Sequence, residues 1–126
     1  MSGDRLATLV VDGYLEQLAG WAGDLHWTWA VVDSLVRDKP ELAWPILLEV
    51  MERVPDGNLN VLSAGPLEDY LGNHGPRVID AVEAEAAANL RLRQALAMMW
   101  QGGMTDDVWQ RVQAIADPSL AMAMDL

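Results

Sequence analysis

The sequence of 126 residues contains no cysteine, no phenylalanine and a single lysine. The lack of cysteine excludes disulfide bonds, thiolate-ligated iron–sulfur clusters and thiolate zinc sites. Basic residues are also few, because eight of them stand against nineteen acidic residues and leave a net charge of −11. Binding to a nucleic-acid backbone or to an anionic membrane surface depends on lysine and arginine. We therefore expect neither a nucleic acid nor a membrane as a partner.

Long apolar runs are absent as well. No stretch reaches the roughly eighteen uncharged apolar residues of a membrane-spanning helix. Residues 1–13 lack the apolar centre and the small-residue cleavage site of a secretory signal. Together with the lack of cysteine, these features predict a cytoplasmic protein. Hydrophobic residues still make up 52% of the sequence, so we expect the chain to fold, as one domain over residues 1–126.

Apolar residues recur at steps of three and four through nearly the whole chain, and this period is typical of amphipathic helices. No segment combines two-residue alternation with hairpin turn chemistry, so the sequence predicts no strand. The expected fold class is all-α, with about seven short antiparallel helices. Their expected ranges are 6–20, 24–37, 39–54, 58–71 in two pieces, 76–89, 90–101 and 105–116.

The spacing of these helices is compatible with two arrangements. Helical hairpins of the HEAT or tetratricopeptide kind would occupy residues 24–116, after a capping helix in residues 1–22 and before a short tail, 117–126. A compact orthogonal bundle with the same short connections is the alternative. The sequence leaves both arrangements open, together with the oligomeric state.

Local signals predict several helix starts. Asp38, Pro40 and Glu41 have the order of a helix start, with Asp38 as the N-cap and Pro40 in the first turn. Pro45 falls inside the helix that follows, where its missing N–H and its ring predict a kink, and a restart at Trp44 is the alternative. Of the two, we expect the kink.

Further signals predict breaks in the second half of the chain. Pro66 predicts the start of a new helical piece. The stretch 72–75 is rich in glycine and precedes Pro76, which predicts another break. Asn89 is expected to break or cap the helix that begins at Pro76, and Thr105 to cap the last helix.

Two strings are distinctive in combination: Gly-Pro-Leu-Glu at 65–68 and Trp-Gln-Gly-Gly at 100–103. Further segments of the same pattern are 38–44, 64–71, 91–96 and Trp109. On these residues, within the span 24–113, the chain resembles an uncharacterised bacterial family of small helical proteins known only as a domain of unknown function. Pro45 departs from the pattern of that family. Because the family has no established activity, the resemblance implies the limits of the fold and transfers no catalytic role to any residue.

Glu68, Asp69 and His74 come nearest to an acid–base cluster. A carboxylate and an imidazole share proton transfer only when they are close, which here requires the chain to fold back after Leu71. Otherwise the two carboxylates favour the positive end of a helix and the histidine favours its negative end. A buried Glu68 would instead accept backbone N–H groups from a neighbouring helix start.

Other catalytic or metal-binding patterns are missing. The two histidines lack the spacing of metal ligands, no calcium loop is complete, and no serine has the context of a nucleophile. We therefore expect no metal, no cofactor, no catalytic residue and no enzymatic activity.

Six tryptophans supply most of the aromatic residues. Trp27 and Trp29 point about 200° apart on a helix, so we expect one of them to be exposed or covered by the first helix. An exposed tryptophan is a candidate anchor for a partner, and we assign this role to Trp27. Trp44, Trp100 and Trp109 are expected in the core.

Acidic residues recur at helical steps on several of the expected helices. The set comprises Glu49, Glu52, Asp56, Asp80, Glu83, Asp106 and Asp107. In the hairpin arrangement these residues lie on second helices, which commonly line a concave face, and a negative strip there would recognise a basic partner. An ordinary solvated face is the alternative, because Arg53 and Arg77 interrupt the strip.

The leading hypothesis is a small acidic helical module that holds a basic protein partner, for example an immunity protein that neutralises a basic toxin domain. The second hypothesis is an enzyme or small-molecule-binding protein with a pocket near Glu68, His74 and Trp100. The third is a DNA mimic, which the scatter of the acidic residues disfavours. The candidate binding residues are Trp27, Glu49, Glu52, Glu68, Asp69, His74, Asp80, Glu83 and Trp100.

Overall fold

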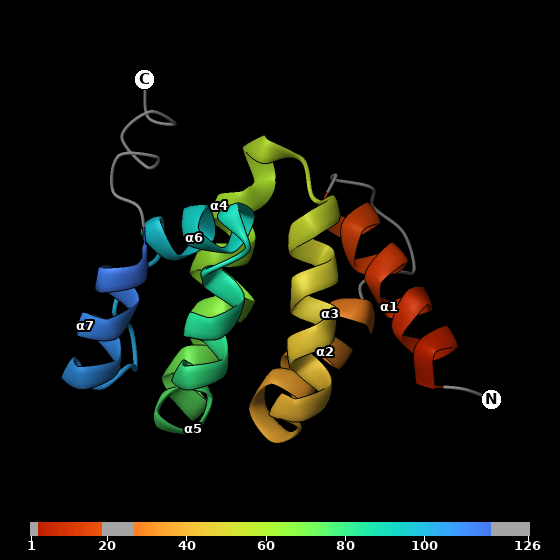
Figure 1. The fold of residues 1–126 in the computed structure, drawn as a ribbon. Helices are drawn as coiled ribbons and strands as arrows, with labels where there is room; N and C mark the ends of the chain where they lie inside the picture. The colour runs from red at the N-terminus through yellow and green to blue at the C-terminus, as the bar shows by residue number, and fades with distance from the viewer. Residues whose placement is uncertain (1–2, 19–26, 117–126) are drawn as a thin grey trace. The chain divides into compact units, whose positions relative to one another are not determined.

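The structure, a computed structural model, describes residues 3–18 and 27–116 (Figure 1). Every regular element in these ranges is a helix and none is a strand, which confirms the predicted all-α class for the described residues. The chain divides into two compact units, Met1–Asn58 and Leu59–Leu126. The single domain over residues 1–126 stays a prediction, and so does the arrangement as hairpins or as an orthogonal bundle. Residues 19–26, which include the end of the expected capping helix, and the expected tail lie outside the described residues.

Within residues 3–18 and 27–58, the first unit contains three helices and a short turn. The helices are α1 (Gly3–Leu18), α2 (Trp27–Asp38) and α3 (Pro40–Arg53), and the 3-10 turn η2 (Asp56–Asn58) follows them. Each of the three helices contacts the other two. Their shared core is formed by Val10, Val11, Tyr14, Val32, Val36, Ala43, Ile46, Leu47, Val50 and Met51. These apolar side chains recur at helical steps, so burial of one face holds each helix in place.

The junction of α2 and α3 differs from the prediction. The backbone N–H of Lys39 bonds to the carbonyl of Leu35 at 2.8 Å, so the hydrogen bonding of α2 extends to Lys39. Lys39, rather than Asp38, is therefore the N-cap of α3, and no side chain caps it. α3 runs on through Pro45, so the alternative restart at Trp44 is wrong. Pro40 occupies the first turn as expected, where its missing N–H has no intrahelical partner to lose.

The second unit contains α4 (Leu59–Leu62), η3 (Ser63–Leu67), α5 (Glu68–Ala86), α6 (Leu90–Ala97) and α7 (Asp106–Ile115). The first three of these follow one another without interruption. The described residues therefore form six continuous helices, so the expected count of about seven is slightly too high. The breaks predicted at Pro66 and at residues 72–76 do not occur. Among the described residues, no helix is both long enough and apolar enough to cross a membrane.

The turn η3 explains why Pro66 does not end the helix. In regular α-helical hydrogen bonding, Pro66 would lack a bond to the carbonyl of Leu62 and its ring would crowd that carbonyl. The chain instead forms a π-helical turn, in which the N–H of Glu68 bonds to the carbonyls of Ser63 and Gly65. The buried Ser63 hydroxyl donates to the carbonyl of Ala95 at 2.5 Å and so joins this turn to α6. The widened turn carries the helix past the proline.

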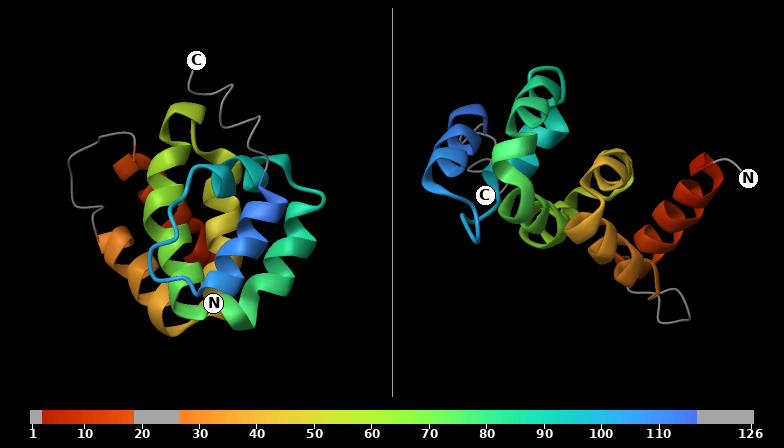
Figure 2. Two further views of the ribbon diagram at one scale, coloured as in Figure 1. Left: turned by 90° about the vertical axis from the view of Figure 1, so that its left-hand side faces the viewer. Right: turned by 90° about the horizontal axis from the view of Figure 1, so that it is seen from below.

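Close packing explains why α5 continues through its glycines. α5 contacts α7, and Figure 2 shows the two helices side by side from two directions. A Cβ atom at Gly75 would lie 2.9 Å from Cγ1 of Val108 on α7. A Cβ atom at Gly72 would lie 3.5 Å from the Cα of Gly103. Both glycines therefore face a neighbouring segment, and packing there outweighs their low helix propensity.

The predicted cap at Thr105 is confirmed, whereas Asn89 caps the start of α6 rather than the helix before it. Oδ1 of Asn89 accepts a hydrogen bond from the N–H of Leu92 at 3.0 Å, at the start of α6. Oγ1 of Thr105 accepts one from the N–H of Val108 at 3.4 Å, at the start of α7. Each cap satisfies one of the N–H groups that a helix start leaves without a partner.

Two substitutions within α5 test the approach of α7. Gly75→Ala and Gly72→Ala both gain helix propensity, by about 1 kcal/mol. Only the new methyl group at residue 75 meets a rigid branched side chain, so we expect Gly75→Ala to lower the free energy of unfolding by about 1–2 kcal/mol. Gly72→Ala, the control, is expected to leave stability unchanged or to raise it. Urea denaturation measures both.

Val108→Ala supplies the second arm of this test. Val108→Ala removes the atoms that a methyl group at residue 75 would meet. The double variant should therefore lose about 1 kcal/mol less free energy of unfolding than the sum of the losses in the two single variants. Equal stability of the two glycine variants, together with additive effects of Gly75→Ala and Val108→Ala, would contradict the described packing.

Candidate functional site

The most distinctive surface feature of the second unit is the loop 98–105, which joins α6 to α7. Gly102 in this loop has a φ of +52°, in the left-handed region that favours glycine. A Cβ atom at Gly102 would lie 2.3 Å from Oε1 of Glu68, so the carboxylate at the start of α5 rests against the Cα of this glycine. Beside it, Gly103 lies against Gly72. The loop therefore packs directly on the first turns of α5.

Hydrogen bonds within the loop hold its shape. The N–H of Met104 bonds to the carbonyl of Gln101 at 2.9 Å and closes a tight turn around the two glycines. The side-chain nitrogen Nε2 of Gln101 donates to the carbonyl of Met104 at 3.1 Å and to Oδ1 of Asp106 at 2.8 Å. These bonds join the loop to the first turn of α7, which Thr105 caps.

Trp100 projects from this loop into solvent. The flanking side chains of Met99 and Met104 are buried, whereas Trp100 is 76% exposed. The expectation that Trp100 belongs to the core is therefore wrong. The reason is that α6 ends at Ala97, so residue 100 no longer follows the period of the buried helix face, and the two methionines supply the apolar contacts of the loop.

The surroundings of this loop are electronegative. Glu68 and Asp69 occupy the first turn of α5, and Asp106 and Asp107 occupy that of α7. None of these four carboxylates forms an ion pair with a basic side chain in the part of the chain that the structure describes. The last turn of α6 carries no basic residue either, although its carbonyl end is the negative end of the helix dipole. A cation near Trp100 would therefore be favoured.

The predicted acid–base pair of Glu68 and His74 does not form. Because α5 does not break, the two residues lie six positions apart on one helix and point about 120° apart. His74 is buried, its ring lies edge-on to that of Tyr70 with centroids 6.1 Å apart, and its Nδ1 is 2.8 Å from Nη2 of Arg77. A guanidinium only donates, so Nδ1 accepts and the ring proton lies on Nε2. The surroundings of the buried His74 thus differ from those of Glu68 and of the exposed Trp100.

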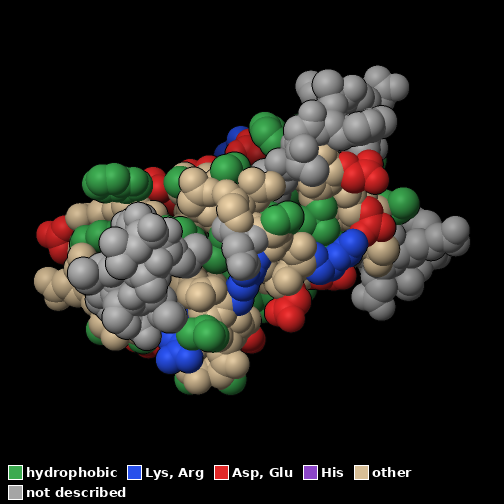
Figure 3. Space-filling view, turned by 90° about the horizontal axis from the view of Figure 1, so that it is seen from above, with side chains coloured by type: hydrophobic (Ala, Val, Ile, Leu, Met, Phe, Trp, Pro, Cys, Tyr) green, Lys and Arg blue, Asp and Glu red, His purple; other side chains and the backbone are tan. Residues whose placement is uncertain are grey.

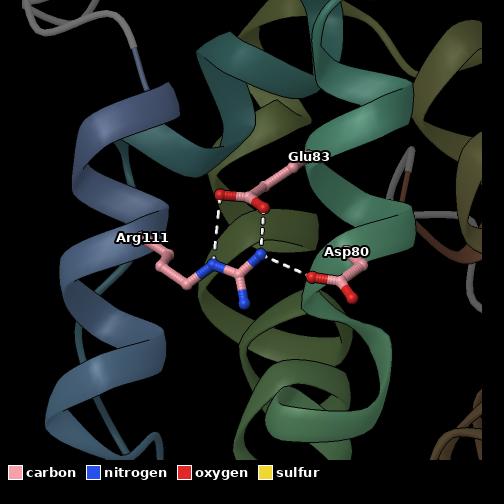
Figure 4. A network of polar contacts seen from close by, with 3 residues as sticks. All are labelled: Asp80, Glu83 and Arg111. Atoms are coloured by element: carbon pink, nitrogen blue, oxygen red, sulfur yellow. Dashed lines mark hydrogen bonds and ion pairs between the residues drawn. The ribbon is translucent and has the colours of Figure 1, made fainter.

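Asp80 and Glu83, two members of the predicted acidic strip, bind an arginine of the same unit (Figure 4). Nε of Arg111 on α7 donates to Oε2 of Glu83 at 3.2 Å, and Nη2 donates to Oε1 of Glu83 and, at 2.5 Å, to Oδ1 of Asp80. The bonds with Glu83, and then those with Asp80, raise the pKa of Arg111 above its usual value. These carboxylates join α5 to α7 and are already occupied.

The candidate residues of the first unit lie on α2 and α3. Nη1 of Arg53 pairs with Oδ1 of Asp12 at 2.9 Å and with Oε1 of Glu49 at 3.7 Å, so Glu49 is partly neutralised, whereas Glu52 is exposed. Trp27 and Trp29 are 44% and 47% exposed. As expected, they do not share one buried face, and α1 covers part of Trp29 through Tyr14, whose ring centroid is 6.0 Å away.

A scan against family models matches residues 16–120 to a family of unknown function, DUF6869. The chain belongs to the DUF6869 family. No curated protein and no solved structure matches it. The match includes both strings that carried the resemblance, and the structure brings these strings together, since Glu68 ends the first and Gly102 lies in the second. In this DUF6869 protein the two strings therefore form one packed site.

Sequence reasoning missed the contact between Glu68 and Gly102. The signal was present, because a pair of glycines after a tryptophan predicts a turn with a close backbone approach. The side chain that approaches them is 34 residues earlier in the chain, and no local pattern joins the two positions. Among residues 3–18 and 27–116, no group of three or more histidine, aspartate and glutamate side chains is placed to hold a metal ion.

Gly102→Ala tests the shape of the loop. An alanine in the left-handed region costs about 1–2 kcal/mol, and its methyl group would also displace the Glu68 carboxylate. We expect the free energy of unfolding to fall by about this amount in urea denaturation. Gly57→Ala is the matched control, because its Cβ meets open space and its φ is not positive, and we expect no loss. A Gly102→Ala variant as stable as the Gly57→Ala control would show that the loop has another conformation.

Proposed function

We propose that this DUF6869 protein is an interaction module that holds a basic protein partner, and that it has no catalytic role. One observation carries the proposal: Trp100 is 76% exposed on a loop that buried neighbours and internal hydrogen bonds hold in place, among carboxylates without a cationic partner in the described chain. Exposed tryptophans are the side chains that most often anchor a protein interface. A fixed loop also loses little conformational entropy on binding.

The distribution of charge supports a basic partner. Arg37, Arg53 and Arg111 each pair with two carboxylates of their own unit. Each of these three cations already serves two anions, and the net charge of −11 leaves a large acidic excess over the whole sequence. Figure 3 shows acidic and hydrophobic side chains in the view from above, with basic side chains among them. The net negative charge would accelerate the approach of a basic protein and discriminate against acidic ones.

Two further parts of the proposal concern the biological setting. An immunity-type or inhibitor-type protein, which neutralises a basic domain, is one form that fits the small size and the charge. A cytoplasmic location is also proposed, and the lack of cysteine supports it. The exposed Trp27 of the first unit, with Glu49 and Glu52 on α3, is the competing surface for the partner.

The proposal is tested by capture of proteins from a lysate of the native host on the tagged full-length protein, at about 50 mM and about 500 mM salt. We expect a protein rich in lysine and arginine to be retained at low salt and released at high salt. Trp100→Ala should reduce its retention, whereas Trp27→Ala, an equally large change at another exposed tryptophan, should not. Circular dichroism confirms that both variants are folded.

Three results would contradict the proposal: no protein retained at low salt, retention that does not depend on salt, or a retained protein that is itself acidic. Loss of retention in Trp27→Ala alone would instead assign the partner to the first unit.

A further inference from the structure

We infer that the loop 98–105 receives an arginine side chain of the basic partner, stacked on the indole of Trp100 and paired with the carboxylate of Glu68. This inference rests on the proposed function and names the chemistry of the contact. It combines two observations. The indole of Trp100 is exposed, and the carboxylate of Glu68 lies against Gly102, which is two residues after Trp100 in the loop.

The exposure of Trp100 leaves an aromatic face open. With 76% of the residue in contact with solvent, the indole is attached to the protein by little more than its stem, while the buried Met99 and Met104 hold the backbone on both sides. The face of an indole attracts cations through its negative quadrupole, and tryptophan does so more strongly than the other aromatic residues. The open face thus favours a cationic or aromatic group.

The charges around the loop decide whether the indole face receives a cationic or an aromatic group. Glu68 and Asp69 lie on one side, Asp106 is bound to Gln101 on the other, and the carbonyl end of α6 faces the loop without a basic residue in its last turn. The opposite dipole end, at the start of α7, is already satisfied by the cap of Thr105 and by two aspartates. The carboxylates of Glu68 and Asp106 thus place negative charge at the loop, which favours a cation and disfavours a phosphate.

Arginine fits this site better than lysine does. Its planar guanidinium stacks on an aromatic face while its edge donates two parallel hydrogen bonds to a carboxylate, and it is more weakly hydrated than an ammonium group. A second copy of the chain is a less suitable source of the arginine. Four of its seven arginines, Arg37, Arg53, Arg77 and Arg111, already bind groups within their own unit. Arg91 also has an interaction partner, and Nε of Arg93 is buried. The occupant we infer is therefore an arginine of another protein.

The test uses three acetylated and amidated peptides of equal length, in which glycine alternates with arginine, lysine or citrulline. Citrulline keeps the shape of arginine without the charge. Isothermal titration at low ionic strength measures the affinity of each peptide for the full-length protein and for its Trp100→Ala, Trp100→Phe, Trp27→Ala and Glu68→Gln variants. Circular dichroism and analytical ultracentrifugation establish that each variant is folded and whether it self-associates.

We expect the arginine peptide to bind more tightly than the lysine peptide, and the citrulline peptide to bind least. Trp100→Ala should weaken binding of the arginine peptide about five-fold, Trp100→Phe should weaken it less, and Glu68→Gln should weaken it about three-fold. Trp27→Ala should bind like the unchanged protein. This pattern separates a stacked, paired guanidinium from the general attraction of an acidic protein for a cationic peptide.

An arginine peptide that binds Trp100→Ala as tightly as the unchanged protein would overturn the inference. So would equal affinities of the arginine and lysine peptides, or a dimer of the unchanged protein that Trp100→Ala dissociates, because the occupant would then be a second copy. If the peptides give one of these contradicting results while a basic protein is still captured in a salt-dependent way, the inference is wrong and the proposed function stands. If binding of the arginine peptide depends on Trp100 but no protein is captured, the contact with arginine is supported and the proposed function is contradicted.

Discussion

The close approach of the loop 98–105 and α7 to one face of α5 is the constraint on which the candidate site depends. Gly75 leaves room for Val108, Gly72 lies against Gly103, and Glu68 lies against Gly102 on the same face. Because these contacts hold the loop from below, Met99 and Met104 turn inward and Trp100 turns outward. A larger side chain at Gly75 would move α7, and the loop that leads into it would lose its support.

The same packing separates two kinds of acidic residue. Asp80 and Glu83 lie along α5 where α7 presents Arg111, so the guanidinium joins the two helices and neutralises part of their charge. Glu68 and Asp69 follow the π turn within one continuous helix, whereas Asp106 and Asp107 occupy the first turn of α7 and complement its positive dipole end. Within the described residues none of these four carboxylates has a cationic partner. Their charge remains directed at solvent around an exposed indole. We therefore propose that the partner binds at the loop rather than along an acidic strip on the helices.

Local chemistry made part of this structure predictable. The caps at Asn89 and Thr105 depend on residues three positions away, and the helical period of the core is visible in the sequence. The breaks expected at Pro66 and at residues 72–76 failed because a π turn and the packing of Gly75 on α7 depend on the tertiary structure. Arg111 binds carboxylates 28 and 31 positions earlier in the chain, and the exposure of Trp100 follows from where α6 ends; no local pattern contains either fact.

The exposure of Trp100 is the most direct test of this account. ¹⁹F NMR of the protein labelled with 5-fluorotryptophan resolves its tryptophans, each assigned by substitution with phenylalanine, and the change of each shift between H₂O and D₂O reports contact with solvent. The structure predicts a larger isotope shift for Trp100 than for Trp44 and Trp109, which are both partly buried. A Trp100 signal shifted no more than those two would place its indole inside the protein and contradict the account.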